Sequence, residues 1–97
     1  MALKTSNLYG KIVISISAVR NVVTATASES YGVAWAKCGK VYAVNNRMMI
    51  NARIILKFGV SIDAVIESVR SAIKYNVEHF SGMIVECVNI DVLGIQN

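Results

Sequence analysis

The sequence predicts an α+β fold: a two-layer sandwich in the order β-α-β-β-α-β, with both helices on one face of a mainly antiparallel sheet. Residues 33–59 alternate between apolar and polar side chains around a turn at Asn45-Asn46, as in a β-hairpin. Residues 62–80 place apolar side chains at steps of three and four, as in an amphipathic helix. The chain has 97 residues, which suits one domain over residues 10–97 after a flexible segment over residues 1–9.

The first strand and the first helix are predicted from residues 10–32. The run Gly10–Ser15, "GKIVIS", is short and rich in β-branched residues, which favours a strand. A helix is expected next, with Ser17 as its N-cap and Gly32 closing its end. The apolar positions at helical spacing are Ile16, Val19, Val23 and Ala27.

A hairpin of two strands is predicted between Val33 and Gly59. Two asparagines tolerate the positive φ angles of a tight turn, so the chain is expected to reverse at Asn45-Asn46. In the returning strand one face is expected to be buried and the other exposed to water. The first face carries Met48, Ile50, Ala52, Ile54, Leu56 and Phe58, and the second carries Arg47, Asn51, Arg53 and Lys57, with Ile55 as the exception.

The second helix and the last strand complete the predicted fold. Ser61 is expected to cap the helix, Asp63 to favour its first turn, and Gly82 to end it. Its apolar stripe consists of Ile62, Val65, Ile66, Val69, Ala72, Ile73, Val77 and Phe80. Lys74 and Glu78 are four residues apart on the opposite side. The final strand is expected to turn Val88, Ile90 and Val92 to the core, and Asn89 and Asp91 outward.

The junction "FGVSID" between the hairpin and the second helix is a candidate phosphate site. A glycine before a helix can cradle phosphate. Here the glycine is alone, without the spacing of a P-loop or of a dinucleotide fingerprint. We therefore interpret the junction as a structural turn in which Ser61 satisfies backbone donors.

No catalytic, cofactor-binding or metal-binding residue is predicted. Cys38 and Cys87 belong to no CxxC or Cys/His cluster, so two reduced thiols are expected, with a disulfide or redox pair as the alternative. Zinc is not expected with two cysteines and one histidine. His79 is interpreted as a surface side chain that helps to finish the second helix, against the alternative of a dyad with a cysteine. The chain is therefore expected not to be an enzyme.

Composition favours an intracellular protein that associates with itself. Hydrophobic residues make up 55% of the chain and charged residues 16%. No apolar run approaches the roughly 20 residues of a membrane span, and the N-terminus lacks the apolar centre of a secretory signal. The apolar excess predicts either a rich core or an exposed patch that meets another copy. The candidates for self-association are Trp35, Tyr42 and Ile55, together with Leu93.

The basic residues of the hairpin predict a surface for an anionic partner. Between Glu29 and Asp63 the sequence has no acid but holds five of its ten lysines and arginines. An ordinary solvated face is the alternative to a surface that binds nucleic acid, acidic protein or lipid headgroups. RNA-binding sheets add exposed aromatic side chains, but Trp35 and Tyr42 have opposite parity, so at most one is expected beside the cations. The candidate residues are Lys37, Lys40, Arg47, Asn51, Arg53 and Lys57.

Several stretches resemble the alkaline shock protein family of Gram-positive bacteria, also described as YloU-like envelope stress response proteins. They are "YGKIVIS", "YGV" after the first helix, and "LKFGVSIDAVIESVRSAIKYNVEHFSGMIVECVNIDVLGI". The family elements map onto Gly10–Ile14, Gly32-Val33, Phe58–Ile62 and Val88–Gly94. The resemblance implies a non-enzymatic, self-associating protein of envelope homeostasis and stress response. It also implies a cytoplasmic location, which includes the inner face of the cell membrane where a membrane-anchored protein holds the family member there.

Overall fold

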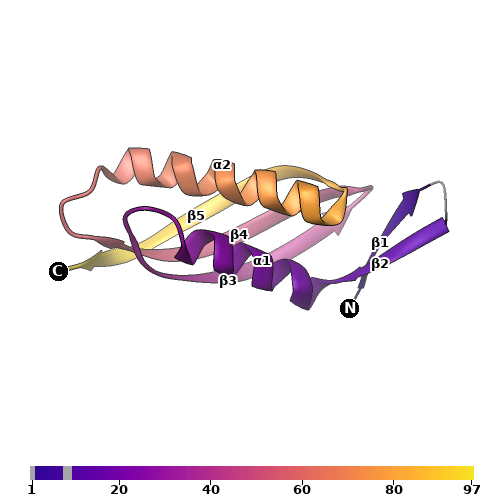
Figure 1. The fold of residues 1–97 in the computed structure, drawn as a ribbon, viewed down its shortest axis with the longest axis horizontal. Helices are drawn as coiled ribbons and strands as arrows, with labels where there is room; N and C mark the ends of the chain where they lie inside the picture. The colour runs from indigo at the N-terminus through magenta and orange to yellow at the C-terminus, as the bar shows by residue number, and fades with distance from the viewer. Residues whose placement is uncertain (1, 8–9) are drawn as a thin grey trace.

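The computed structural model describes residues 2–7 and 10–97, which form two helices and two separate sheets (Figure 1). The first two strands pair antiparallel with each other, and the other three form a mixed sheet in the order β3-β4-β5. In chain order the elements are β1 (Ala2–Asn7), β2 (Gly10–Ser15), α1 (Ile16–Ser28), β3 (Val33–Val44), β4 (Arg47–Lys57), α2 (Ile62–Ser81) and β5 (Ile84–Gln96).

The α+β class is confirmed, but the predicted strand arrangement is wrong in two respects. The strand at Gly10–Ser15 pairs with β1 and lies outside the main sheet, which therefore follows the order α-β-β-α-β. Strand β5 runs parallel to β4, so the sheet is mixed and not mainly antiparallel. Side-chain alternation identifies a strand but specifies neither its neighbour nor its direction. The 20-residue helix α2, about 30 Å long, carries the chain back to the end where β4 began, and this makes β5 parallel.

The predicted flexible segment over residues 1–9 is only partly covered by the structure. Residues 1, 8 and 9 lie outside the described residues, while Ala2–Asn7 form strand β1. Flexibility of this segment stays a prediction. In Figure 1 the β1–β2 pair projects from one end of the molecule, next to the start of α1.

Helix α1 begins two residues earlier than predicted. The N-cap is Ser15, whose Oγ accepts a hydrogen bond of 2.9 Å from the Ala18 N–H, so the prediction of Ser17 is wrong. The helix ends at Ser28, capped by the N–H of Glu29, and Gly32 lies in the following turn with φ +83°. The predicted apolar face is confirmed, because Val19, Val23 and Ala27 are buried.

Both helices cover the same face of the three-stranded sheet, and the core lies between these layers (Figure 1). The central strand β4 contributes alternate side chains that are all 0% exposed, which confirms the predicted buried face of the hairpin. Those side chains are Met48, Ile50, Ala52, Ile54 and Leu56. Helix α2 packs over them with Val65, Val69, Ile73 and Val77.

The tight turn and the end of α2 follow the sequence. Asn45 and Asn46 have φ of 53° and 62°, so both occupy the positive-φ positions of the predicted turn. Gly82 ends α2 with φ 73°. Ser61 stands at the N-cap as predicted, but its side chain makes no capping hydrogen bond, so the role given to its hydroxyl is wrong.

Three predicted core side chains at the ends of elements are instead exposed: Phe58, Ile62 and Phe80. Phe58 and Ile62 lie at or beyond the end of a strand or helix, whereas Phe80 lies beside the buried stripe of α2, which continues from Val77 to Ser81. A periodic pattern shows which face a residue joins, but not how far the covering layer reaches.

Candidate functional site on the uncovered sheet face

The face of the three-stranded sheet opposite the helices has no covering element among the described residues (Figure 1). We call it the open face. Strand β4 runs through its middle, and the side chains that alternate with the buried ones project from it. These side chains are Arg47, Met49, Asn51, Arg53, Ile55 and Lys57.

Two β-bulges in β3 place both Trp35 and Tyr42 on the open face. Trp35 lies opposite Ile55 and Tyr42 opposite Met49 in the antiparallel pair. The register shifts between these positions, where Gly39 and Lys40 together face Asn51. One extra residue reverses the alternation downstream, so the prediction that at most one aromatic residue lies beside the cations is wrong. Trp35 is 42% and Tyr42 48% exposed.

Gly39 explains why the second bulge forms at this place in β3. A Cβ atom at Gly39 would lie 3.3 Å from the Asn51 backbone oxygen and 3.5 Å from the Asn51 Cβ atom. The glycine therefore lets β3 approach β4 closely while a second residue, Lys40, is accommodated opposite the same partner. An isolated glycine inside a strand pattern is the sequence signal that could have predicted the bulge.

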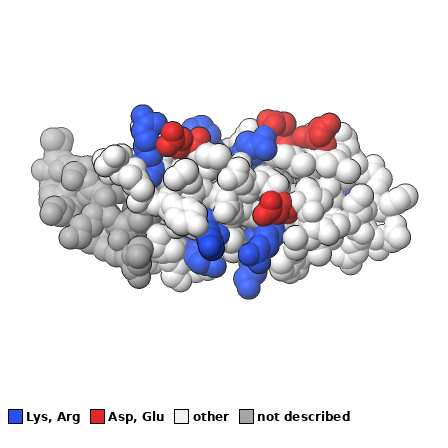
Figure 2. Space-filling model, turned by 180° about the vertical axis from the view of Figure 1, so that it is seen from behind, with Lys and Arg blue, Asp and Glu red and all other residues white. Residues whose placement is uncertain are grey.

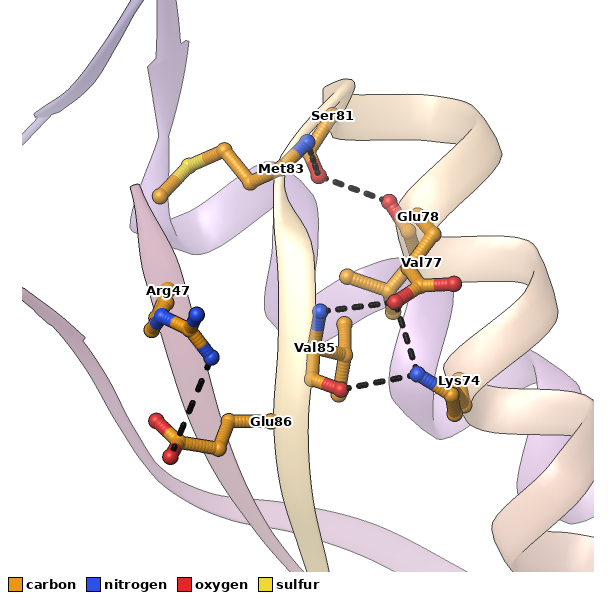
Figure 3. A network of polar contacts seen from close by, with 8 residues as sticks. All are labelled: Arg47, Lys74, Val77, Glu78, Ser81, Met83, Val85 and Glu86. Atoms are coloured by element: carbon orange, nitrogen blue, oxygen red, sulfur yellow. Dashed lines mark hydrogen bonds and ion pairs between the residues drawn. The ribbon is translucent and has the colours of Figure 1, made fainter. Parts of the chain in front are cut away.

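The structure brings most of the predicted basic residues to this face. Lys37 lies opposite Arg53, which has Asp91 of β5 as its other register neighbour. Arg47, at the start of β4, forms an exposed ion pair with Glu86, with 4.0 Å between Nη1 and Oε1 (Figure 3). Lys57 lies at the far end of β4, and Lys40 is exposed in the bulge.

A line of polar side chains crosses the middle of the open face. The Asn89 Nδ2 donates to Asn51 Oδ1 at 3.1 Å, and the Cys87 thiol donates to Asn89 Oδ1 at 3.5 Å. Asn51 was predicted as part of the anionic-partner surface, and in the structure its side-chain oxygen already accepts this bond from β5. Asn89 and Cys87 join the face because β5 is the parallel neighbour of β4.

Charge is divided between the two layers. Strands β3, β4 and β5 together carry five basic residues and two acidic residues. The two helices and the turn between α1 and β3 together carry three basic residues and four acidic residues. Figure 2, which views the molecule from behind Figure 1, shows scattered basic groups, a few acids and broad uncharged areas. The sheet layer therefore has net positive charge, and the open face combines cations with exposed aromatic and aliphatic side chains.

The thiols and the histidine do not come together into a reactive cluster in the described residues. Both cysteines are free: Cys38 is buried on the core side of β3, and Cys87 lies on the open face. Burial raises the pKa of the Cys38 thiol, and the nearby Arg20 guanidinium opposes this only in part. His79 stands in the last turn of α2 with its ring 4.2 Å from that of Tyr75, and neither thiol bonds to it. Within the described part of the chain no group of three or more His, Cys, Asp or Glu residues could hold a metal ion.

A second group of exposed apolar side chains lies along the last half of β5. Leu93 is 57% and Ile95 54% exposed, and Val92, predicted to face the core, is 37% exposed. Strand β5 contains bulges at Glu86 and Leu93, and the second moves Leu93 out of register with β4. Sequence reasoning gave Leu93 as a candidate and missed Val92 and Ile95, because alternation assigned them to a covered face.

Comparison with known proteins agrees with the fold and gives the family. The fold is that of a small α+β domain with one sheet face open. Residues 36–97 match the model of the alkaline shock protein family, described as having a cell envelope-related function, and the chain belongs to this family. No curated protein matches the chain.

Solved structures of MamM CTD share the fold. A variant of MamM CTD in a copper form has a TM-score of 0.60 and 16% sequence identity, covering 84% of this chain and 99% of that chain. Another copper form of MamM CTD has a TM-score of 0.57 and 16% sequence identity, covering 84% of this chain and 87% of that chain. A zinc form of a further variant has a TM-score of 0.53 and 15% identity, covering 84% of both chains. At this level of identity the likeness shows the fold alone.

Proposed function

We propose that this protein is a non-catalytic scaffold of the cell envelope that works by associating with copies of itself and with other proteins. The observation that carries the proposal is the number of large apolar side chains exposed on the sheet layer. They form two groups, one on the open face and one along the end of β5. Exposed apolar groups of this extent mark interaction surfaces in soluble proteins, and membership of the alkaline shock protein family supports an envelope-related role.

Association with the membrane is proposed to be indirect. Neither α1 nor α2 combines the length and the apolar content that crossing a membrane requires. We propose a cytoplasmic location, with a membrane-anchored protein holding the scaffold at the inner face of the membrane. Crosslinking in native cells at physiological salt, followed by fractionation, tests this: recovery with envelope proteins is expected, and recovery with ribosomes or RNA alone would contradict it.

Sedimentation velocity at increasing protein concentration tests self-association. The sedimentation coefficient is expected to rise with concentration, because the exposed apolar surface is removed from water when copies associate. Circular dichroism at each concentration controls for changes in fold. A protein that stays monomeric throughout the range would contradict the scaffold proposal.

Binding of single-stranded RNA is a second candidate function, supported by the bulges in β3. They place Trp35 and Tyr42 on the same face as Lys37 and Arg53, which supplies both base-stacking groups and phosphate-binding charges. Two copies stacked through the open face would bring these cations together, which like-charge repulsion disfavours. The open face therefore suits an anionic partner better than a second copy.

Fluorescence anisotropy with a mixed pool of single-stranded oligonucleotides tests this candidate. Replacement of Arg53 by Ala is expected to weaken binding and reduce its salt dependence, whereas Arg20→Ala on α1 is expected to leave both unchanged. Trp35→Ala is expected to weaken binding, while Tyr31→Ala, at an exposed aromatic residue outside the sheet, serves as its control. Absence of binding at low salt would remove the candidate.

A further inference from the structure

The three-stranded sheet has two edges, and the structure protects them to different extents. Strands β3 and β5 are the edges, because the order is β3-β4-β5. An edge strand presents unpaired N–H and C=O groups that can pair with a strand of another molecule. Bulges, lysines and contacts from neighbouring elements make such pairing unfavourable.

The edge of β3 is interrupted at several points between Val33 and Lys40. It contains two bulges, and the second holds an exposed lysine, Lys40. Between the bulges the Cys38 N–H donates to Thr24 Oγ1 of α1 at 3.1 Å, which removes a donor from the edge. The bulges, the lysine and the occupied donor together make strand pairing along β3 unfavourable.

The first half of β5, Ile84–Val88, is closed by side chains of α2, and we call this contact the clamp (Figure 3). The Val85 N–H donates to Glu78 Oε2 at 2.9 Å, and the Val85 carbonyl accepts from Lys74 Nζ at 3.0 Å. The Arg70 Nε donates to the Val88 carbonyl at 3.2 Å. These bonds occupy three of the backbone groups that an added strand would need.

The second half of β5, Asn89–Gln96, has one bulge, at Leu93, but none of the other protection. Within residues 15–97 no side chain bonds to the backbone of this segment. The bulge at Glu86 gives Val85 and Val88 the same backbone orientation, away from β4. Alternation from Val88 turns the backbone groups of Ile90 and Val92 the same way, and the bulge at Leu93 makes Ile95 the next residue with this orientation. The segment contains no lysine, arginine or proline, and its one charged residue is Asp91.

We propose that the second half of β5 is the self-association edge, where it pairs antiparallel with β5 of a second copy about a two-fold axis at Val92. This rests on the proposed self-association and names its surface. The pairing would join two three-stranded sheets into one continuous sheet of six strands. It would cover the exposed side chains of Val92 and Leu93, and it keeps the cations of the open face away from each other.

The charge of Asp91 selects the axis. With the axis at Val92, Asp91 lies opposite the bulged pair Leu93-Gly94 of the second copy, and Ile90 lies opposite Ile95. An axis one residue earlier would set the two Asp91 carboxylates directly opposite each other, which is destabilising across a strand pair. In this register the uncharged run from Val92 to Gln96 faces Asn89–Val92 of the second copy, where Asp91 is the one charged residue.

A charge exchange at Leu93 tests this register with two variants of one exposed position. Leu93→Asp places a carboxylate opposite Asp91 of the second copy, whereas Leu93→Lys places an ammonium there. We expect the dissociation constant from sedimentation to be at least about tenfold weaker for the Asp variant than for the Lys variant. Each variant is first shown to unfold at a urea concentration close to that of the wild type.

Cysteine crosslinking provides a measurement that does not depend on charge. In a chain that also carries Cys87→Ser, Val92→Cys places one cysteine of each copy opposite the other across the two-fold axis. Their Cα atoms are expected to lie about 5.5 Å apart, which suits a disulfide. Rapid formation of a covalent dimer on oxidation is expected, and Tyr75→Cys on the exposed side of α2 is the control.

The outcomes separate this inference from the proposed function. A wild-type chain that is monomeric at every concentration would contradict both. A wild-type chain that associates while crosslinking at position 92 is no faster than at position 75 would overturn the β5 edge and leave self-association standing. Equal dissociation constants for the two Leu93 variants would likewise overturn the assigned register and edge.

Discussion

Removal of the Glu78 carboxylate is expected to destabilise the fold and to open the clamped half of β5. In the clamp, Glu78 Oε2 accepts from both the Val85 N–H and Lys74 Nζ, each at 2.9 Å. Glu78→Ala leaves the Val85 N–H without its acceptor, which costs about 1–3 kcal/mol when the group is buried. Loss of the Lys74 ion pair adds about 0.3–0.5 kcal/mol. The Glu78 side chain is 31% exposed, so water replaces part of the lost bonding, and we expect a total of about 1–2 kcal/mol.

The effect depends on pH in a direction that the structure fixes. The hydrogen bond from Lys74, followed by that from the Val85 N–H, lowers the pKa of the Glu78 carboxyl in the folded state. A group with a lowered folded pKa stabilises the protein above its unfolded pKa, about 4.3 for Glu. This stabilisation is lost as the pH falls through the folded value. The difference in unfolding free energy between wild type and Glu78→Gln is therefore expected to shrink as the solution is acidified.

Urea denaturation at pH 7 and at acidic pH measures both effects. Glu78→Gln keeps an acceptor oxygen for the Val85 N–H and is the matched control for loss of charge alone, expected to lose less than Glu78→Ala. Sedimentation of Glu78→Ala is expected to show self-association like that of the wild type, because Val85 lies outside the Asn89–Gln96 segment that pairs in the proposed register. An Ala variant as stable as the wild type at pH 7, or a destabilisation that does not change with pH, would refute the reasoning.

Two further predictions concern the turns and the thiols. Gly32 has φ +83°, and a Cβ atom there would lie 2.7 Å from Val65 Cγ2. Gly32→Ala is therefore expected to lower the free energy of unfolding, measured by urea denaturation, by about 2–5 kcal/mol. Gly59 has φ +90°, and a Cβ atom there would meet nothing within 4 Å, so Gly59→Ala is expected to lower the free energy of unfolding by only about 1–2 kcal/mol. Equal losses for the two variants would show that packing at Gly32 is unimportant. Iodoacetamide at pH 8 is expected to modify Cys87 and spare Cys38 in the folded chain, because Cys38 is buried and its thiol pKa is raised. Mass spectrometry showing equal modification of both thiols without urea would contradict this.

Much of the local structure was predictable because it depends on residues that are close in sequence. The positive φ angles at Asn45 and Asn46 follow from the tolerance of asparagine for that conformation. The end of α2 at Gly82 follows in the same way from a residue that accepts a left-handed cap. The buried face of β4 follows from strict alternation, which holds in that strand without interruption.

The open face was predicted only in part, because its composition depends on irregularities in the neighbouring strands. Arg47, Arg53 and Lys57 share one face of β4 as their parity predicts. The position of Tyr42 beside Met49 depends on the bulge at Gly39 and Lys40, which parity counting ignores. Asn89 joins the face through a neighbour that alternation does not identify.

The sequence by itself determined the α+β class, the hairpin, the two amphipathic helices and the basic character of the central strands. These depend on side-chain periodicity, on turn residues and on composition, all of which can be counted along the chain. Tertiary structure alone decided that β5 runs parallel to β4, that bulges gather Trp35 and Tyr42 on one face, and that α2 closes only half of the β5 edge. The physical reason is that strand direction, register and edge protection arise from contacts between segments far apart in sequence, which local patterns do not encode.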